Sequence, residues 1–222
     1  MKAEMAQVEQ LMLQITGDEK HDGAARSPLD VLWVLYDRVL RYDPRHPRDE
    51  ERDRFILSKG HGPIGLYTIL ALKGFFETSE LATFAQWESR LGGHPDRNQV
   101  PGIEASTGSL GHGLPMAIGM ALGLRLKKSE RHVFVLMGDG ECNEGSVWEA
   151  ALLAGHQRLS NLTGIVINNR SSTPDLGDIA GKFAAFGWHA TTINGRDHEQ
   201  IYAALTHPVE EHPTLIVAEI TA

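Results

Sequence analysis

The sequence predicts an α/β fold with a mainly parallel sheet, and two observations lead to this prediction. Short apolar segments with the composition of buried strands alternate, in the second half of the chain, with longer segments of helical character. Glycine and polar clusters stand at the ends of the strand segments rather than inside them. Strands that alternate with helices form βαβ units, which build a parallel sheet.

The first third of the chain is predicted to be mostly helical. Apolar residues recur at helical spacing over residues 3–16 and again over residues 29–40, so we expect two packing helices. Residues 43–54 are rich in charge and proline, which is typical of a solvated connection. The motif LSKGHG then leads into the apolar segment 66–76, which places His61 at a strand-to-helix turn, where side chains commonly face a ligand.

The rest of the chain contains the clearest βαβ unit. A glycine-rich region at residues 91–113 includes the motifs GGHP and STGSLGHG and precedes a helix of small residues. Two apolar strands bridged by a helix then predict a right-handed parallel crossover. The predicted elements are a helix at 114–126, a strand at 132–137, a helix at 144–159, a strand at 163–167, a strand at 190–193, a helix at 197–205 and a strand at 214–220.

Length and charge narrow the classes of function. A chain of 222 residues with 41% hydrophobic content can bury one sizeable core, so we expect a single domain over residues 1–222. The 21 basic residues are scattered, and 29 acidic residues give a formal charge of -8. We therefore expect no nucleic-acid partner.

Cysteine content and the amino-terminal residues favour a cytoplasmic protein. Cys142 is the sole cysteine and has no partner for an intrachain disulfide. The first twenty residues lack the apolar run and cleavage site of a signal peptide. No apolar stretch approaches the roughly 20 residues that a membrane-spanning helix needs, so no membrane association is expected.

Polar residues follow the two strands of the βαβ unit. A GDG turn with Asp139 and Gly140 follows the first strand, and Asn168 and Asn169 follow the second. Both groups are expected at the carboxyl edge of the sheet, where open α/β folds bind ligands, and their oxygens are the donors that Mg²⁺ prefers. Gly140 and the next helix would let a diphosphate approach the backbone. Either group alone also fits a plain tight turn or a polar strand end.

The segment from GDG to Asn169 closely resembles the thiamine-diphosphate motif of transketolases. The motifs LSKGHG, GGHP and TGSLGHG occur in the order of that family, and the resemblance covers about residues 18–218. It implies the thiamine-diphosphate-binding fold, a three-layer sandwich, with thiamine diphosphate and Mg²⁺ as cofactors.

The resemblance also implies roles for individual residues. Asp139 and Asn169 would bind the metal through their side chains and Ser171 through its backbone carbonyl, while Gly140 would face the diphosphate. The cofactor would further be lined by His61, Gly108, Ser109 and Leu110. His94 would reach the substrate, and His94, His61 and His21 are the candidates for catalytic proton transfer, since histidine titrates near neutral pH.

Several of these residues also have structural interpretations. A histidine beside glycines is often a hydrogen-bonded turn residue, and the match around His21 is loose because Asp22 replaces the family's proline. His112 stands where the family usually has glutamine. The remaining histidines show no metal-ligand pattern; they are His46, His132, His156, His189, His198, His207 and His212.

An acidic cluster follows the GDG turn. Glu141, Glu144 and Glu149 suit the start of a helix, where the macrodipole favours negative charge. The resemblance offers a second interpretation, in which Glu144 and Glu149 lie near a subunit interface. Trp148 would be buried in the core or in that interface.

The function implied is transfer of a two-carbon ketol unit from a ketose phosphate to an acceptor. Family members also need a glutamate from a separate pyrimidine-binding domain, which this chain is too short to contain. We therefore expect an amino-terminal subunit of a split transketolase, with two copies each of this chain and a carboxy-terminal partner subunit in an α2β2 heterotetramer.

Two departures from the family keep alternatives open. The loop after Asn169 is short, and the sequence stops at AEITA, where related subunits continue into a loop with a further active-site histidine. One alternative is a specialised subunit that delivers the two-carbon unit to a carrier-protein-bound or other non-sugar acceptor. Another is a non-catalytic cofactor-binding or regulatory subunit. The α subunit of a 2-oxo acid dehydrogenase shares the GDG and asparagine elements but not the SKGHG and GGHP motifs.

Overall fold

A five-stranded parallel sheet forms the centre of the molecule, as seen in a computed structural model that describes residues 2–13, 15, 22–207 and 209–220. The strand order is β1-β2-β3-β5-β4, and every neighbouring pair is parallel. The strands are β1 (Arg54–Leu57), β2 (Val133–Gly138), β3 (Leu162–Asn168), β4 (His189–Asn194) and β5 (Thr214–Glu219).

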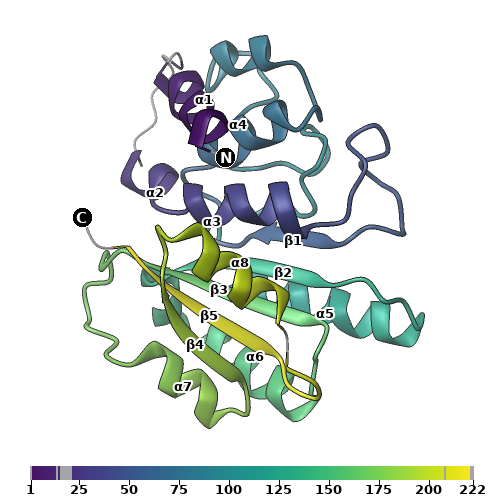
Figure 1. Cartoon of the computed structure of the whole chain (residues 1–222), viewed down its shortest axis with the longest axis vertical. Helices are drawn as coiled ribbons and strands as arrows, with labels where there is room; N and C mark the ends of the chain where they lie inside the picture. The colour runs from purple at the N-terminus through teal and green to yellow at the C-terminus, as the bar shows by residue number, and fades with distance from the viewer. Residues whose placement is uncertain (1, 14, 16–21, 208, 221–222) are drawn as a thin grey trace.

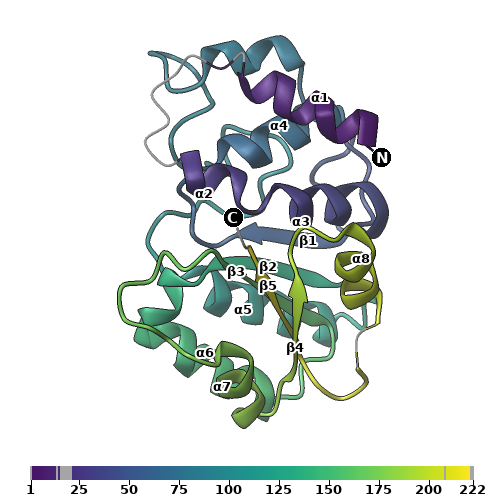
Figure 2. The same ribbon diagram turned by 60° about the vertical axis from the view of Figure 1, so that its left-hand side comes forward.

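Helices cover both faces of the sheet, so the fold is the expected three-layer α/β sandwich (Figures 1 and 2). One face carries α1 (Lys2–Leu13), α2 (Asp22–Arg26), α3 (Leu29–Val34), the π-helix η1 (Leu35–Val39), α4 (Ile64–Leu72) and α8 (His198–Thr206). The other carries α5 (Gly113–Leu126), α6 (Gly145–His156) and α7 (Ile179–Ala185). Two 3-10 helices are η2 (Thr78–Thr83) and η3 (Gly140–Asn143).

Alternating side chains on the strands divide the core into two clusters. Phe134 and Leu136 of β2 pack with the α1, α3 and α4 side, whereas Val133 and Val135 pack with α5, α6 and α7. This division follows from the period of two along a strand. All four side chains are at most 3% exposed, so both faces of β2 are buried, as expected for a central parallel strand.

One close approach explains a glycine in α6. A Cβ atom at Gly155 would lie 1.7 Å from the carbonyl oxygen of Phe186, so only glycine lets α6 pack against the end of α7. The indole nitrogen of Trp188 donates a hydrogen bond to the carbonyl of Ala151, also on α6, at 2.8 Å. These contacts fix α6 and, with it, the turn between β2 and α6.

Most expected elements are present, although the short helices α2, η2 and η3 were not predicted and further differences are found. The helix expected at residues 29–40 begins as α3 and ends as the π-helix η1. The sequence did not single out α7 or the four-residue strand β1, although the strand-to-helix turn at His61 is confirmed. Among the described residues, no helix combines the length and apolar character needed to cross a membrane.

Candidate functional site

The carboxyl ends of β1, β2 and β3 bring three polar loops to one edge of the sheet. Gly138 pairs with Ile167, and the amide of Asp139 donates a hydrogen bond to the Ile167 carbonyl at 3.1 Å. The strand register therefore places Asp139 beside Asn168 and Asn169. The loop that contains His61 follows β1, the neighbour of β2 in the sheet.

Asp139 is a buried carboxylate held only by neutral donors. It is 2% exposed; the Ser171 hydroxyl donates to Oδ1 at 2.6 Å, and the Ser172 amide donates to Oδ2 at 3.1 Å. In the part of the chain that the structure describes, no Lys, Arg or His side chain forms an ion pair with it. Each oxygen keeps a further lone pair, so the carboxylate can bind a cation.

Asn169 places an amide oxygen next to the same loop. Its Oδ1 accepts a hydrogen bond from the Ser171 amide at 3.2 Å, and its Nδ2 donates to the Ser27 hydroxyl at 3.4 Å. Carboxylate, amide and carbonyl oxygens are hard donors, so the donor set is of the type that Mg²⁺ prefers. The described residues contain no group of three or more His, Cys, Asp or Glu side chains arranged around a metal. The remaining ligands would therefore be water and phosphate oxygens.

Gly140 has space beside it that the chain itself does not fill. A Cβ atom there would meet only the Ser171 hydroxyl oxygen, at 3.9 Å, which is an ordinary contact distance. Packing within the chain therefore does not require glycine at this position. This open space is compatible with the prediction that a ligand approaches the backbone at Gly140.

The loop that contains His61 and the loop that contains His94 both contact Gly108. A Cβ atom at Gly60 would lie 2.6 Å from the Cα atom of Gly108, and one at Gly108 would lie 2.8 Å from the Cδ2 atom of His94. Gly60 has a φ angle of +70°, a backbone conformation that residues with a side chain rarely adopt. The structure thus brings the loop of His61 and the GGHP loop of His94 onto the same TGSLGHG segment.

The predicted histidines differ in how they are held. The Nδ1 atom of His61 lies 3.0 Å from the carbonyl oxygen of Lys59, which orients the partly exposed imidazole. His94 is exposed, and its backbone carbonyl accepts a hydrogen bond from the Tyr67 hydroxyl at 3.1 Å. Ser109 is exposed and Leu110 is half-buried, both in the same segment. His21 lies outside the described residues.

Glu141 connects three loops, a role that the sequence did not reveal. It is 2% exposed, and its Oε1 accepts hydrogen bonds from the Ser58 hydroxyl at 2.5 Å and the Gly111 amide at 2.9 Å. Its Oε2 is buried without a hydrogen-bond partner. Burial raises the pKa of the Glu141 carboxyl, although its hydrogen bonds and the nearby charge of Lys59 act in the opposite direction. Its position is therefore not explained by the helix macrodipole.

The other acids and Trp148 of this region occupy different environments. Glu144 and Glu149 are exposed, and Trp148 packs against Phe183 with a ring-centroid distance of 5.2 Å. Lys59, between Ser58 and the His61 turn, is 3% exposed and donates a hydrogen bond to the Ala24 carbonyl. No sequence signal beyond the SKGHG motif distinguishes Lys59, because its partner lies in a distant segment.

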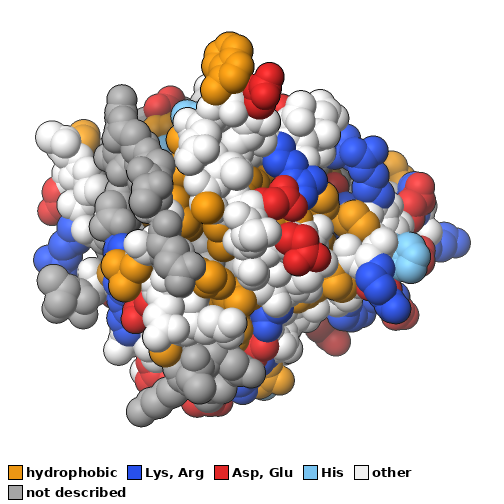
Figure 3. All heavy atoms as spheres, turned by 90° about the horizontal axis from the view of Figure 1, so that it is seen from above, with side chains coloured by type: hydrophobic (Ala, Val, Ile, Leu, Met, Phe, Trp, Pro, Cys, Tyr) orange, Lys and Arg blue, Asp and Glu red, His pale blue; other side chains and the backbone are white. Residues whose placement is uncertain are grey.

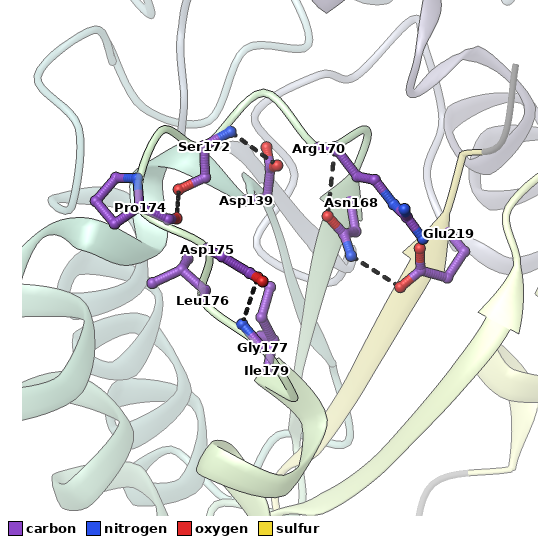
Figure 4. A pocket seen from close by; sticks show the side chains of 10 residues that line it. All are labelled: Asp139, Asn168, Arg170, Ser172, Pro174, Asp175, Leu176, Gly177, Ile179 and Glu219. Atoms are coloured by element: carbon purple, nitrogen blue, oxygen red, sulfur yellow. Dashed lines mark hydrogen bonds between the residues drawn. The ribbon is translucent and has the colours of Figure 1, made fainter.

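A polar cavity of about 430 Å³ opens beside Asp139 (Figure 4). Its other lining residues are Asn168, Arg170, Ser172, Pro174, Asp175, Leu176, Gly177, Ile179 and Glu219. The Asn168 amide donates to Glu219 Oε1 at 2.8 Å, and the Gly177 amide donates to Asp175 Oδ1 at 2.8 Å. The loop between β3 and α7 therefore forms one wall of a space large enough for a small molecule.

Known proteins are similar to this chain in sequence and in structure. The sequence matches the family described as "Transketolase, thiamine diphosphate binding domain" over residues 12–221. It is 48% identical over 217 residues to Ferredoxin fas2 of Rhodococcoides fascians, covering 95% of this chain and 70% of that protein. It is 41% identical over 194 residues to one subunit of the apulose-4-phosphate transketolase of Actinobacillus succinogenes, covering 83% of this chain and 70% of that protein.

Solved structures show the same likeness. A transketolase from Pichia stipitis in complex with sedoheptulose-7-phosphate superposes with a TM-score of 0.79 at 29% identity, covering 89% of this chain and 36% of that chain. The chain also spans 33% of human transketolase, to which it is 37% identical over 207 residues. It therefore corresponds to about a third of the full-length transketolases.

Proposed function

This chain belongs to the transketolase family, and on that premise we propose that it is the amino-terminal subunit of a split transketolase. It would transfer a two-carbon ketol unit from a ketose phosphate to an acceptor, with thiamine diphosphate and Mg²⁺ as cofactors. The family match supports the type of cofactor-binding domain, because the matched family is described by its binding of thiamine diphosphate.

The observation that carries the proposal is the environment of Asp139. A carboxylate that is 2% exposed and accepts hydrogen bonds only from Ser171 and Ser172 has no protein cation to balance its charge among the described residues. A divalent cation would supply that charge, and Asn169 adds an amide oxygen at the end of the next strand. We assign the metal to Asp139, Asn169 and the carbonyl of Ser171, with Gly140 against the diphosphate.

When bound, thiamine diphosphate supplies the electron sink for breaking and forming the carbon–carbon bond of the transferred unit. The chain's own residues would position it and move protons. Gly108, Ser109, Leu110 and His61 would line its ring system. We assign contact with the substrate to His94, which is exposed and lies against Gly108, and His94, His61 and His21 are the candidates for proton transfer.

A partner subunit completes the proposal. Two relatives are each named as one subunit of an apulose-4-phosphate transketolase, which supports a second, separate subunit for this chain too. That second chain would carry the pyrimidine-binding domain and its activating glutamate, in an α2β2 assembly. Residues 1–222 would then act as one diphosphate-binding domain in the cytoplasm.

Two classes of acceptor molecule are compatible with the proposal. Lys59 is engaged with the Ala24 carbonyl, and Arg97 lines a different cavity, so neither is placed to bind a substrate phosphate at this edge. If the partner subunit supplies those groups, a sugar phosphate is accepted. If it does not, a non-sugar acceptor, such as a group carried on a protein, is the second candidate.

The experiment is to co-express this chain with the product of the neighbouring gene and measure thiamine-diphosphate-dependent cleavage of a ketose phosphate. We expect activity only in the mixture, and its loss in Asp139→Asn. Asp175→Asn is the matched control, because Asp175 is an exposed carboxylate in the same cavity.

The possible outcomes separate the functions. Cofactor binding with no ketose cleavage would direct the search to non-sugar donors and acceptors or to a regulatory subunit. Absence of cofactor binding in the mixture would contradict the proposal.

A further inference from the structure

A second cavity shares no lining residue with the cavity beside Asp139. It has a volume of about 130 Å³ and lies between the segments 47–52 and 97–103. Residues 47–52 precede the amino end of β1, whereas the predicted site follows its carboxyl end. The loop between η1 and β1 projects at the right of Figure 1, and Lys and Arg side chains lie along the right-hand side of the face in Figure 3.

Three arginines and no acidic residue line this cavity. They are Arg48, Arg52 and Arg97; the other lining residues are Pro47, Asn98, Gln99, Val100, Pro101, Gly102 and Ile103. Arg48 and Arg97 are exposed, and neither side chain forms an ion pair or hydrogen bond within residues 2–13, 15, 22–207 and 209–220. Two guanidinium groups on facing segments thus lack an anionic partner.

Arg52 is the fixed member of the set. Its side chain is 15% exposed and pairs with the buried Glu104 at 2.5 Å, while its NH1 atom donates to the Asp53 carbonyl at 3.1 Å. Its Nε atom is buried and has no acceptor. Glu104 therefore orients Arg52 without occupying all five of its donors.

The nearby carboxylates are engaged elsewhere. Asp96 Oδ1 accepts hydrogen bonds from the Asn98 amide at 2.8 Å and the Ser106 hydroxyl at 3.2 Å. Asp49 Oδ1 accepts from the Glu51 amide at 2.8 Å. These acids stabilise the turns next to the arginines, and they do not pair with Arg48 or Arg97.

The cavity floor is held rigidly against the core. Gly102 has φ +87°, and a Cβ atom there would lie 2.7 Å from Phe75 Cδ1 and 2.8 Å from Leu70 Cδ2. Only glycine fits this turn, which follows the buried Val100. A rigid floor lowers the entropy lost when a ligand is bound.

We propose that this cavity binds the phosphoryl group of a small anionic ligand. Guanidinium groups match the geometry of phosphate oxygens and form short, charge-assisted hydrogen bonds with them. The volume equals that of about four water molecules, which suits one phosphoryl group, so the rest of a larger ligand extends toward solvent. This cavity has no lining residue in common with the cavity beside Asp139, and the proposal does not depend on the function proposed there.

The test is a titration of the protein with inorganic phosphate, observed through the ¹⁵N-labelled arginine Nε–Hε signals in NMR spectra. The ionic strength is kept constant with sodium chloride, since screening alone changes surface electrostatics. We expect saturable shifts for Arg48, Arg52 and Arg97. The double variant Arg48→Gln/Arg97→Gln should bind phosphate at least about tenfold more weakly.

Arg45→Gln is the control. Arg45 lies in the same loop but pairs with Asp43 at 2.8 Å, so its loss should leave phosphate binding unchanged. A parallel titration with glucose 6-phosphate distinguishes the sources. Equal affinity indicates a site for free phosphate, and tighter binding indicates a phosphorylated metabolite. Linear, non-saturable shifts, or unchanged affinity in the double variant, would overturn the proposal.

Discussion

The two edges of the sheet differ in the groups that donate hydrogen bonds to their buried carboxylates. At the amino edge, Asp53 is 6% exposed and receives the backbone amide and two guanidinium nitrogens of Arg41 at 2.9–3.1 Å. At the carboxyl edge, Asp139 is 2% exposed and receives a serine hydroxyl and a backbone amide. One carboxylate is paired with an arginine, and the other has only neutral hydrogen-bond donors among the residues that the structure describes.

The second acid on each edge repeats the contrast. Glu104 lies 2.5 Å from Arg52 in an ion pair, whereas Glu141 accepts hydrogen bonds from Ser58 and Gly111 and forms no ion pair within 4 Å among the described residues, although the charge of Lys59 acts to lower its pKa. A paired buried carboxylate joins segments of the fold, and removing it leaves the donors that pointed at it without their acceptor. A buried carboxylate that lacks a cation is a candidate for binding one. Burial alone therefore does not separate a structural acid from a functional one, but the charge of its partners does.

The largest loss of stability is expected for Asp53→Asn. Its amide would face the donors of Arg41 and the backbone amide of His132, which now donates to Asp53 Oδ1 at 2.9 Å. Because these hydrogen bonds to a charged acceptor would be weakened, we expect the free energy of unfolding to fall by about 3 kcal/mol, measured by urea denaturation. Asp49→Asn, in the exposed loop nearby, should change it by less than about 0.5 kcal/mol. Equal effects would remove the distinction between the two edges.

A somewhat smaller loss is expected for Glu141→Ala. The Ser58 hydroxyl and the Gly111 amide would lose their buried acceptor, at a cost of about 2 kcal/mol in the free energy of unfolding. Glu141→Gln keeps an acceptor oxygen and should recover at least half of that loss. If both variants unfold at the same urea concentration, the connection between the three loops does not depend on these hydrogen bonds.

His132 adds a pH dependence at the amino edge. Burial lowers the pKa of its imidazole to about 4, so the folded state disfavours the charged form that the unfolded chain takes up below about pH 6.5. Stability is then present above this value and falls by roughly 2 kcal/mol as the pH drops from about 6.5 to about 4. His132→Gln should lack this part of the slope in urea denaturation measured across that pH range. A parallel slope in the variant would contradict the assignment.

The smallest change in stability is expected for Asp139→Asn without metal. Only neutral donors contact this carboxylate, so its removal leaves no buried positive charge behind, and the free energy of unfolding should change by less than about 1 kcal/mol. We expect Mg²⁺ and thiamine diphosphate to raise the melting temperature of the wild-type chain, and the same variant should lack that increase. A loss of stability as large as that of Asp53→Asn would mean that Asp139 is a structural acid.

The sequence predicted the carboxyl edge better than the contacts that hold it. The apolar runs of β2 and β3 made the strands and their polar ends visible, so Asp139 and Asn169 could be placed together. The short helix α7 was missed because it buries only Ile179 and Phe183 and contains Gly181, and its start depends on the Asp178 side chain accepting the Gly181 amide at 2.8 Å.

The roles of Ser58 and Glu141 were not predictable for a different reason. The two residues are 83 positions apart and meet only after β1 and β2 pair. The same holds for Arg52, which lies in the segment 43–54 interpreted as a solvated connection, and for Glu104, which no sequence pattern singled out. Local patterns reveal strand ends, whereas the pairing of buried charges depends on tertiary contacts that no local pattern encodes.

The most direct test of the cofactor assignment uses Mn²⁺ in place of Mg²⁺, since both prefer oxygen ligands. With thiamine diphosphate present, paramagnetic broadening of backbone amide signals should be strongest at Gly140, Asn169 and Ser171 and should disappear in Asp139→Asn. Broadening centred on Asp175 and Glu219, the other acids of the same cavity, or unchanged broadening in the variant, would contradict a metal site at Asp139.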